Sequence, residues 1–296
     1  MLLVTGATGF IGSHLVKRLL AEKKPVRVLA RDVGKARELF KGALVAEGDV
    51  LDVNSMAAAA KGIDTVIHLA GLVSYSEKDR QKLYGTNVTG TENVVKAFPN
   101  ARIILSSSVG VYGQIIGKAD ENYRHKPESY YGQTKILAEK TVLNASADNV
   151  VFRIAPIYGA GSRHWKKIMD TMVKGYPIPR NNKKTHIVHV SDAVQAFVLA
   201  LEHGHGVYNI ADREPTPFTD LALEVAKLLG VKPKLMDERL LKLLSIIKGK
   251  SRDLKIWTMP RNYDIGRARK ELGFSPRADM HAELKKMVDW YRNLPA

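Results

Sequence analysis

Short apolar runs alternate with longer amphipathic segments through the first half of the chain. The runs predict six strands, at Leu2–Thr5, Val26–Ala30, Ala43–Ala46, Thr65–Leu69, Ile103–Ser106 and Val150–Ile154. The segments between them have the spacing of amphipathic helices. Strands that are apolar almost throughout are typical of parallel sheets covered on both faces. The pattern therefore predicts an α/β fold with a doubly wound parallel sheet, and it leaves the order of the strands open.

The alternation of strand-like and helix-like segments ends after about Ile157, where glycine, proline and basic residues become frequent. Helices are predicted over Ser191–Glu202, Phe218–Leu229, Asp264–Leu272 and Ala278–Asn293. Ser191 and Asp264 are the expected N-caps, and Gly230 and Gly273 the expected C-terminal stops. We expect a large sheet domain over residues 1–157, to which later segments can return, and a smaller lobe over residues 158–296.

The first predicted strand runs directly into a glycine-rich turn and a helix. Gly6, Gly9 and Gly12 follow one another at intervals of three residues, with Thr8, Phe10 and Ile11 between them. Glycine allows a tight turn and a close backbone approach, and the N–H groups of a helix N-terminus bind phosphate. A glycine triplet alone can be a structural turn, but at this strand–helix junction it predicts a Rossmann-type dinucleotide site.

The end of the second strand reads Val28-Leu29-Ala30-Arg31-Asp32 and bears on the choice of cofactor. If Ala30 closes the strand, Arg31 is placed for the 2′-phosphate of NADP, with Lys35 as a second cation. A shift of one or two residues gives Asp32 the ribose 2′-hydroxyl and favours NAD. We expect NADP, with NAD as the alternative.

A tyrosine and a lysine lie one helical turn apart in Tyr131-Gly132-Gln133-Thr134-Lys135. Ser129 is placed to cap a helix that starts near Tyr130. A free phenol has a pKa of about 10, and an ammonium group nearby favours the phenolate. The pair alone can be a surface contact; with a hydroxyl from Ser106-Ser107-Ser108 at a strand end, it predicts a hydride-transfer site.

Here the chain resembles the extended short-chain dehydrogenase/reductase family, including sugar-nucleotide epimerases and dehydratases and reductases of the 3β-hydroxysteroid and dihydroflavonol types. The resemblance covers nearly the whole chain. Its marks are the glycine turn, the Tyr131/Lys135 pair, Gly48-Asp49-Val50, His68-Leu69-Ala70-Gly71, Asn87-Val88-Thr89-Gly90-Thr91, Ser106 through Gly113, Arg153 through Gly159, His189-Val190-Ser191-Asp192, Val207 through Ile210 and Leu272 through Pro276.

The resemblance implies a role for each matching residue. Tyr131 is the acid/base, Lys135 holds the nicotinamide ribose and lowers the tyrosine pKa, Ser108 positions the substrate oxygen, and Asn87 supports this network. The implied cofactor-binding residues also include Asp49, Val50, Leu69, Ala70, Gly71, Asn87, Ser106, Pro156 and Ile157. The second half of the chain becomes the substrate-binding lobe.

Two departures bear on the reaction. Family members that bind nucleotide sugars commonly have asparagine where this chain has Pro156, and often an arginine where it has Thr185. We therefore expect an alcohol dehydrogenase or carbonyl reductase acting on a small molecule. The alternative is a nucleotide-sugar epimerase or dehydratase that keeps its NAD(P) bound, with Arg163, Lys166, Lys167, Lys183 or Lys184 binding the diphosphate.

Composition excludes some chemistry and leaves other possibilities open. The chain has no cysteine, so disulfides and thiolate nucleophiles are excluded, and its nine histidines show no metal-ligand spacing. The net charge of +16 fits a solvated lysine-rich surface, and no motif for specific nucleic-acid binding is present. A catalytically silent NAD(P)-binding sensor or scaffold is the other alternative, against which the intact Ser108, Tyr131 and Lys135 set argues.

Location and assembly are expected from weaker signals. No apolar window reaches the length of a membrane span, and Leu2–Thr5 reads as a strand rather than a signal peptide, so we expect a cytoplasmic protein. The family resemblance implies a homodimer. The apolar segment Leu240–Lys248 can be a lid, an interface or a membrane contact.

Overall fold

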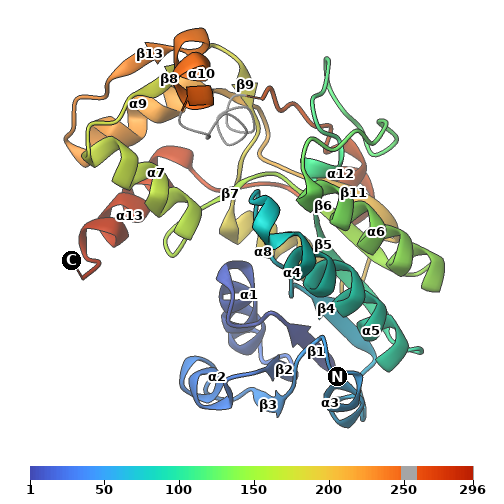
Figure 1. Cartoon of the computed structure of the whole chain (residues 1–296). Helices are drawn as coiled ribbons and strands as arrows, with labels where there is room; N and C mark the ends of the chain where they lie inside the picture. The colour runs from blue at the N-terminus through green and yellow to red at the C-terminus, as the bar shows by residue number, and fades with distance from the viewer. Residues whose placement is uncertain (248–258, 296) are drawn as a thin grey trace.

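A seven-stranded parallel sheet forms the centre of the computed structural model, which describes residues 1–247 and 259–295. Its strand order is β11-β6-β5-β4-β1-β2-β3 (Figure 1). The bounds are β1 (Leu2–Thr5), β2 (Val26–Ala30), β3 (Leu44–Glu47), β4 (Thr65–His68), β5 (Arg102–Ser108), β6 (Val150–Ile154) and β11 (Gly206–Ile210). The predicted doubly wound sheet and its six strands are confirmed, with slightly different strand ends.

Neighbouring residues of each strand point to opposite faces and build two separate cores. On β1, Leu3 packs into one core and Val4 into the other; on β4, Val66 and Ile67 divide in the same way. All four side chains are completely buried. This explains why the strands lack polar alternation: both faces are covered by helices, so each strand position needs an apolar side chain.

Helices from different parts of the chain cover the two faces of the sheet (Figure 1). One face carries α1 (Phe10–Ala21), α2 (Val33–Leu39) and α8 (Val190–Leu199), with α12 (Gly266–Leu272) beside β11. The other carries α3 (Val53–Ala59), α5 (Gly90–Ala97) and α6 (Tyr130–Ala145). A short helix, α4 (Arg80–Tyr84), leads into α5 through the π-helical turn Gly85–Thr89.

The chain leaves the sheet after β6, builds part of a lobe and returns. Strand β11 pairs with β6 from Gly206↔Val150 to Ile210↔Ile154, so the sheet gains its last strand from the second half of the sequence. Together with α8 and α12, this segment extends the sheet domain beyond residue 157.

The lobe has its own apolar core, formed by α7 (Arg163–Val173), α9 (Phe218–Leu229) and α13 (Met280–Arg292). Trp165, Met169, Val225 and Met287 are among the buried side chains of this core. Three two-stranded ladders complete the second half of the chain: β7 (Ile157–Tyr158) with β10 (Val188–His189), β8 (Ile178–Arg180) with β13 (Leu235–Asp237), and β9 (Lys184–Thr185) with β12 (Thr216–Pro217).

Two of the predicted helix starts are wrong, whereas the predicted stops are confirmed. The N-cap of α8 is His189, whose ring nitrogen Nδ1 accepts the N–H of Ser191 at 3.3 Å. Helix α12 begins at Gly266, and the Asp264 carboxylate accepts the N–H of Gly266 from one position farther out than an N-cap. Gly230 and Gly273 end their helices in the left-handed backbone conformation, with φ of 71° and 70°, which favours glycine.

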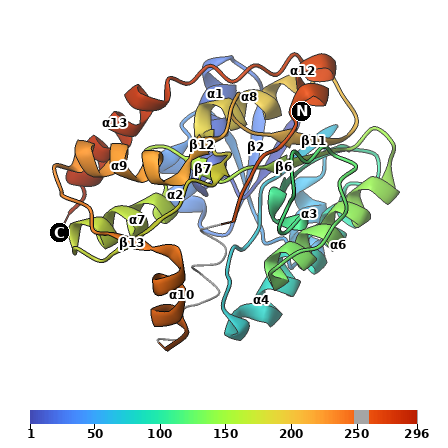
Figure 2. The same cartoon turned by 90° about the horizontal axis from the view of Figure 1, so that it is seen from above.

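The apolar segment Leu240–Lys248 falls mostly on α10 (Glu238–Ile247), which stands at the margin of the lobe (Figure 2). Leu240 and Leu243 are exposed, and Lys248 lies outside the described residues. Within residues 1–247 and 259–295, no helix has the length and apolar character needed to cross a bilayer. Whether the segment acts as a lid, an interface or a membrane contact stays a prediction.

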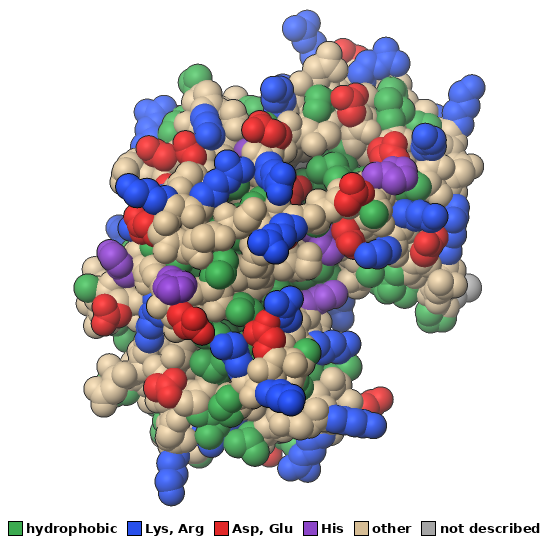
Figure 3. All heavy atoms as spheres, turned by 180° about the vertical axis from the view of Figure 1, so that it is seen from behind, with side chains coloured by type: hydrophobic (Ala, Val, Ile, Leu, Met, Phe, Trp, Pro, Cys, Tyr) green, Lys and Arg blue, Asp and Glu red, His purple; other side chains and the backbone are tan. Residues whose placement is uncertain are grey.

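Basic side chains are spread over the face seen in Figure 3 and are interspersed with acidic ones. The described ion pairs include Lys166–Asp170 at 2.9 Å and Arg267–Glu271 at 3.2 Å, both one helical turn apart. On this face the charges therefore resemble a solvated surface more than a single binding patch.

Candidate active site

A cavity of about 1350 Å³ opens at the carboxyl ends of the sheet strands, between the sheet domain and the lobe. The chain runs outward from β1 to β2 and β3 on one side and from β4 to β5 and β6 on the other. The turns after β1 and β4 therefore diverge, which leaves a crevice where doubly wound sheets bind ligands. All predicted site residues except Asn87 line this cavity.

The glycine turn comes so close to the loop after β4 that side chains would not fit. A Cβ on Gly6, whose φ is +65°, would lie 2.6 Å from the backbone nitrogen of Ala70. A Cβ on Gly12 would lie 2.3 Å from the carbonyl oxygen of Gly6. Helix α1 begins directly after Gly9, which provides no side-chain cap. Its first N–H groups and the positive end of its dipole are thus placed to receive a phosphate.

Arg31 and Lys35 line the end of the cavity beyond β2, whereas Asp32 does not. The Asp32 carboxylate accepts the backbone N–H of Lys35 at 2.9 Å and caps α2. Arg31 lies 3.6 Å from the Asp49 carboxylate, with a side chain that is 82% exposed. Strand β2 ends at Ala30. With this strand end, Arg31 rather than Asp32 is the residue expected beside the ribose.

Tyr131 lies in the first turn of α6, where the sequence predicts it. The Ser129 hydroxyl caps this helix by accepting the N–H of Gly132 at 3.2 Å. The Tyr131 phenol is buried against the cavity wall and hydrogen-bonds to Ser108. Burial raises the pKa of Tyr131, with a smaller contribution from Tyr75, while the bond to Ser108 opposes the shift.

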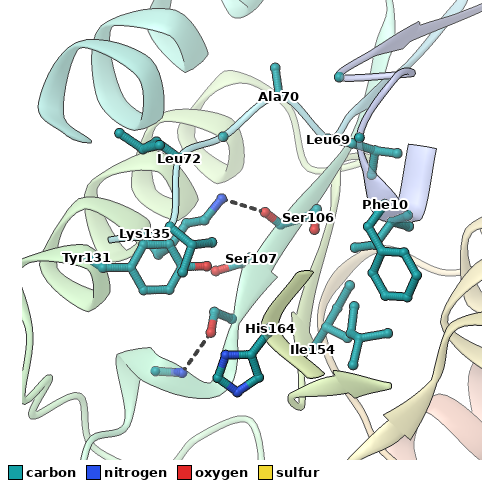
Figure 4. Close-up of a pocket in the computed structure, with 18 of the residues that line it drawn as sticks. Phe10, Leu69, Ala70, Leu72, Ser106, Ser107, Tyr131, Lys135, Ile154 and His164 are labelled. Atoms are coloured by element: carbon teal, nitrogen blue, oxygen red, sulfur yellow. Dashed lines mark hydrogen bonds between the residues drawn. The ribbon is translucent and has the colours of Figure 1, made fainter. Parts of the chain in front are cut away.

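Lys135 reaches the same wall one turn farther along α6 (Figure 4). Its Nζ donates to the carbonyl oxygen of Ser106 at 2.8 Å and lies 6.0 Å from the centroid of the Tyr131 ring. Burial lowers the pKa of Lys135 to about 8, and the nearby Glu139 carboxylate opposes this shift.

In this structure burial raises the pKa of Tyr131, so the acidifying effect expected of Lys135 stays a prediction. The phenolate would be desolvated, and the ammonium group points to the Ser106 carbonyl instead of the phenol oxygen. The two side chains do share one helix face and one cavity, as the spacing predicted. Tyr131 therefore keeps its proton near neutral pH, which is the form of a general acid.

The three serines at the end of β5 have different surroundings. Ser108 Oγ accepts the N–H of Gly110 at 3.0 Å and contacts Tyr131, so its hydroxyl lies at the cavity wall. Ser107 donates to the Glu139 carboxylate at 2.5 Å. Ser106 contributes its carbonyl to Lys135. Ser108 is thus the serine placed beside the phenol, as the position in the motif implies.

Asn87 lies beneath the cavity and does not line it. It is 1% exposed and belongs to the π-helical turn, a feature that often accompanies functional sites. Its amide donates to the carbonyl oxygen of Leu72 and to Thr134, and its oxygen accepts the N–H of Leu72, all at 2.8–3.0 Å. It therefore fixes the loop after β4 against α6, a supporting position and not one of direct contact.

The sequence interpretation missed the buried ion pair between Glu139 and Arg153. Arg153 Nη2 lies 2.7 Å from Glu139 Oε2, and both side chains are nearly inaccessible. Glu139 follows Lys135 by four residues on α6, so the pair supports the floor beneath Lys135 and Ser107. The sequence did contain one indication of this pair: Glu139 lies on the helix face that is predicted to be buried, where a charged side chain needs a partner.

The lobe contributes a further wall that sequence reasoning did not assign. It is formed by Trp165, Ile168, Thr185, Ile187, Phe218, Leu221, Met259 and Arg261, with His164 among them. These residues are scattered over about a hundred positions, and no local spacing connects them.

The residues present fit a dinucleotide. The crowded glycine turn, the uncapped start of α1 and the cations beyond β2 can hold its diphosphate and adenosine, and Lys135 with Tyr131 marks the nicotinamide end. A Cβ on Gly71 would lie 3.3 Å from both Asn87 Oδ1 and Lys135 Nζ, so a side chain here would push these two groups by a few tenths of an ångström.

Comparison with known proteins gives a consistent family. A family model described as the NAD dependent epimerase/dehydratase family matches residues 2–211. The 3-beta-hydroxysteroid dehydrogenase of Mycolicibacterium neoaurum is 30% identical over 258 residues, spanning 78% of this chain and 70% of that protein. The N-acetyl-alpha-D-glucosaminyl-diphospho-ditrans,octacis-undecaprenol 4-epimerase of Escherichia coli O157:H7 is 27% identical over 245 residues, spanning 78% of this chain and 72% of that protein.

Solved structures resemble the whole chain. MoeE5 in complex with UDP-glucuronic acid and NAD superposes with a TM-score of 0.82 at 28% identity, covering 98% of each chain. UDP-glucose 4-epimerase from Thermotoga maritima with UDP-glucose gives a TM-score of 0.82 at 25% identity, again over 98% of each chain. The similarity therefore extends over both the sheet domain and the lobe.

Proposed function

The chain belongs to the NAD dependent epimerase/dehydratase family, and from this premise we propose that it is an NADP-preferring carbonyl reductase or alcohol dehydrogenase. One observation carries the proposal: Tyr131, Ser108 and Lys135 converge on one wall of the cavity whose other end is the glycine turn. A protein that only bound the cofactor, as a sensor or scaffold, would not need this group of side chains.

The three side chains have complementary roles in reduction. A reduced nicotinamide, when bound, would supply hydride to the carbonyl carbon. The Tyr131 hydroxyl donates its proton to the carbonyl oxygen, which becomes the alcohol, and Ser108 holds that oxygen by a hydrogen bond. The phenolate that remains is stabilised by the Lys135 ammonium and regains a proton from solvent. Oxidation of an alcohol follows the same steps in reverse.

The preference for NADP rests on the surroundings of Arg31. Its guanidinium and Lys35 border the adenosine end of the cavity, and Asp32 is held in the α2 cap. A 2′-phosphate would meet two cations there. The Asp49 carboxylate, 3.6 Å from Arg31, is the competing partner that the phosphate would have to displace.

Epimerisation of a nucleotide sugar is the second candidate, and one observation favours it. Thr185 occupies the position where the family resemblance implies an arginine, but Arg261 places its guanidinium there and donates to Thr185 Oγ1 at 3.2 Å. Both residues line the cavity, so a cation absent from the local sequence is supplied from a distant segment. Pro156 still lacks the amide expected of a diphosphate-binding asparagine.

A paired assay separates the two reactions. Oxidation of NADPH is followed against a panel of ketones and aldehydes, while proton NMR follows UDP-glucose, UDP-glucuronic acid and their N-acetylhexosamine counterparts for conversion to the 4-epimers. Consumption of NADPH with ketones supports the reductase. Epimer formation without net change of the cofactor supports the alternative, and the absence of both reactions contradicts the proposed enzyme. The homodimer, the cytoplasmic location and the substrate-binding role of the lobe stay predictions.

A further inference from the structure

His164 brings a polar ring from the lobe into the cavity that holds Tyr131 and Lys135 (Figure 4). It is the second residue of α7, and the Ser162 side chain caps that helix by accepting the N–H of Trp165 at 3.4 Å. The preceding Gly161 has a φ of +94°, and a Cβ there would lie 3.6 Å from the Phe10 ring. The turn that carries His164 is thus seated directly on the glycine turn of the sheet domain.

The surroundings of His164 are mainly apolar. Trp165, Ile168, Ile187, Phe218, Leu221 and Met259 contribute apolar side chains to the lobe wall. Among the described residues that line the cavity, the only carboxylates are Asp49 at the adenosine end and Glu128 beside α6. Arg163, which directly precedes His164, and Arg261 are the cations on the lobe side of the cavity among the described residues. This part of the cavity therefore suits an apolar molecule with an oxygen that accepts hydrogen bonds.

The imidazole of His164 is uncharged near neutral pH. The residue is accessible from the cavity, yet desolvation by the protein atoms around the ring lowers the pKa of His164 to about 4, with further lowering by Arg261 and Lys167. A neutral imidazole has one N–H donor and one acceptor nitrogen. It can bind a substrate oxygen without adding a further charge to this wall.

We propose that His164 determines substrate specificity by donating a hydrogen bond to a second oxygen of the substrate, next to the reacting carbonyl group. The matching substrates are apolar ketones, or the corresponding alcohols, that carry another carbonyl oxygen close to the reacting carbon. This inference rests on the proposed oxidoreductase function, because it places the reacting carbonyl at Tyr131 and Ser108.

A pair of ketones tests the proposal. Ethyl benzoylacetate carries an ester carbonyl beside its ketone, and valerophenone has a similar size without that oxygen. The kcat/KM of each with NADPH is measured for the wild type, for His164→Leu and for His164→Gln. We expect the ratio of the two values to fall about tenfold in the leucine variant, the factor that one hydrogen bond contributes. The glutamine variant, which retains a donor and an acceptor, should keep most of the wild-type ratio.

The ratio cancels the greater intrinsic reactivity of the keto ester and any general damage to the enzyme. An unchanged ratio in His164→Leu overturns the inference, as does a loss of NADPH affinity that lowers both activities equally. If the wild type reduces neither ketone, their dissociation constants for the NADP⁺ complex, measured by saturation-transfer NMR, give the same ratio. A ratio that depends on His164 without turnover contradicts only the proposed function, whereas binding that does not depend on His164 contradicts this inference.

Discussion

The Lys135 ammonium is anchored to the Ser106 carbonyl oxygen at 2.8 Å, and this bond directs it along the cavity wall past the Tyr131 ring. An ammonium has three donors, so two remain for a ribose hydroxyl and for water. Since burial keeps the proton on Tyr131, the structure is arranged for proton donation. In the proposed reduction, this proton is the one that would pass to the carbonyl oxygen.

Tyr131→Phe should abolish turnover while leaving cofactor binding intact. The substitution removes the phenolic proton and the hydrogen bond to Ser108 but keeps the ring that packs against the cavity. Loss of a general acid typically lowers kcat by about 10²–10⁴-fold. Steady-state reduction kinetics and fluorescence titration with NADPH provide the measurements.

Tyr130→Phe is the matched control for that variant. Tyr130 is the adjacent residue on α6, but its ring packs beneath the Arg80 guanidinium at 4.1 Å instead of lining the cavity. We expect it to keep near wild-type kcat. If Tyr131→Phe and Tyr130→Phe were equally active, or lost activity equally, Tyr131 would not be the acid/base.

The pH dependence should show an alkaline limb set by Lys135. Burial lowers the pKa of Lys135 to about 8, so the ammonium loses its proton as the pH rises through that value. The protonated form stabilises the phenolate, and kcat/KM for reduction should therefore decline above about pH 8 and stay level just below it. A pH–rate profile between neutral and alkaline pH measures this limb.

Lys135→Arg distinguishes Lys135 from other titrating groups. An arginine stays charged throughout this range, so the limb should disappear from the profile. The overall rate should also fall, because a planar guanidinium does not reproduce the single contact of Nζ with Ser106. A limb that persists unchanged in this variant would assign it to another residue.

The local sequence predicted the strands and the glycine turn because each of them is formed by residues that are adjacent in the chain. The Ser129 cap and the Tyr131/Lys135 face likewise depend on residues within one or two helical turns. Direct contact of Asn87 with the cofactor was expected, but the π-helical turn places its side chain beneath the cavity.

The missed parts of the site depend on distant segments. Arg261 reaches Thr185 only because Arg261 and Lys184 pair through their backbones, and the Glu139–Arg153 ion pair joins α6 to β6. No spacing along the chain encodes such contacts. The raised pKa of Tyr131 could not be predicted for a related reason: the sequence gives the charge nearby but not the burial of the phenol or the direction of the Lys135 side chain.

Arg31→Ala should weaken NADPH binding and leave NADH binding nearly unchanged. The side chain borders the adenosine end of the cavity, where only NADPH presents a 2′-phosphate. Loss of one charged hydrogen bond corresponds to about 1.5–3 kcal/mol, or roughly a tenfold to hundredfold increase in Kd. Isothermal titration with both cofactors gives the comparison.

Arg37→Ala is the control for charge alone. Arg37 is an exposed cation on α2, the helix that follows Arg31, and does not line the cavity. We expect it to change the two affinities little and equally. Wild-type protein that binds NADH as tightly as NADPH would contradict the proposed cofactor preference, whatever the variants do.

Asp212→Asn should stabilise the fold more at alkaline pH than in mild acid. Burial raises the pKa of Asp212 to about 7, with a further rise from the nearby Asp192 carboxylate. Because the folded pKa exceeds the ordinary value of 3.8, the folded state holds a proton that the unfolded state has released, and stability falls as pH rises through this window to about 7. Asparagine removes the buried charge and still accepts the His189 N–H that Asp212 accepts.

At pH 8 the substitution should raise the free energy of unfolding by on the order of 2 kcal/mol. A pKa shift corresponds to about 1.4 kcal/mol per unit, and the expected gain is smaller than that full value because Asp212 keeps some contact with solvent. Urea unfolding at pH 5 and pH 8 measures it, with the exposed Glu214→Gln as the control for loss of one negative charge. At pH 5 the unfolded chain has already released this proton and the folded chain still holds it, so part of the gain should be present there, but less than at pH 8. An equal gain at both pH values would show that asparagine acts through packing or hydrogen bonding, and that the titration of Asp212 is not the cause of the gain.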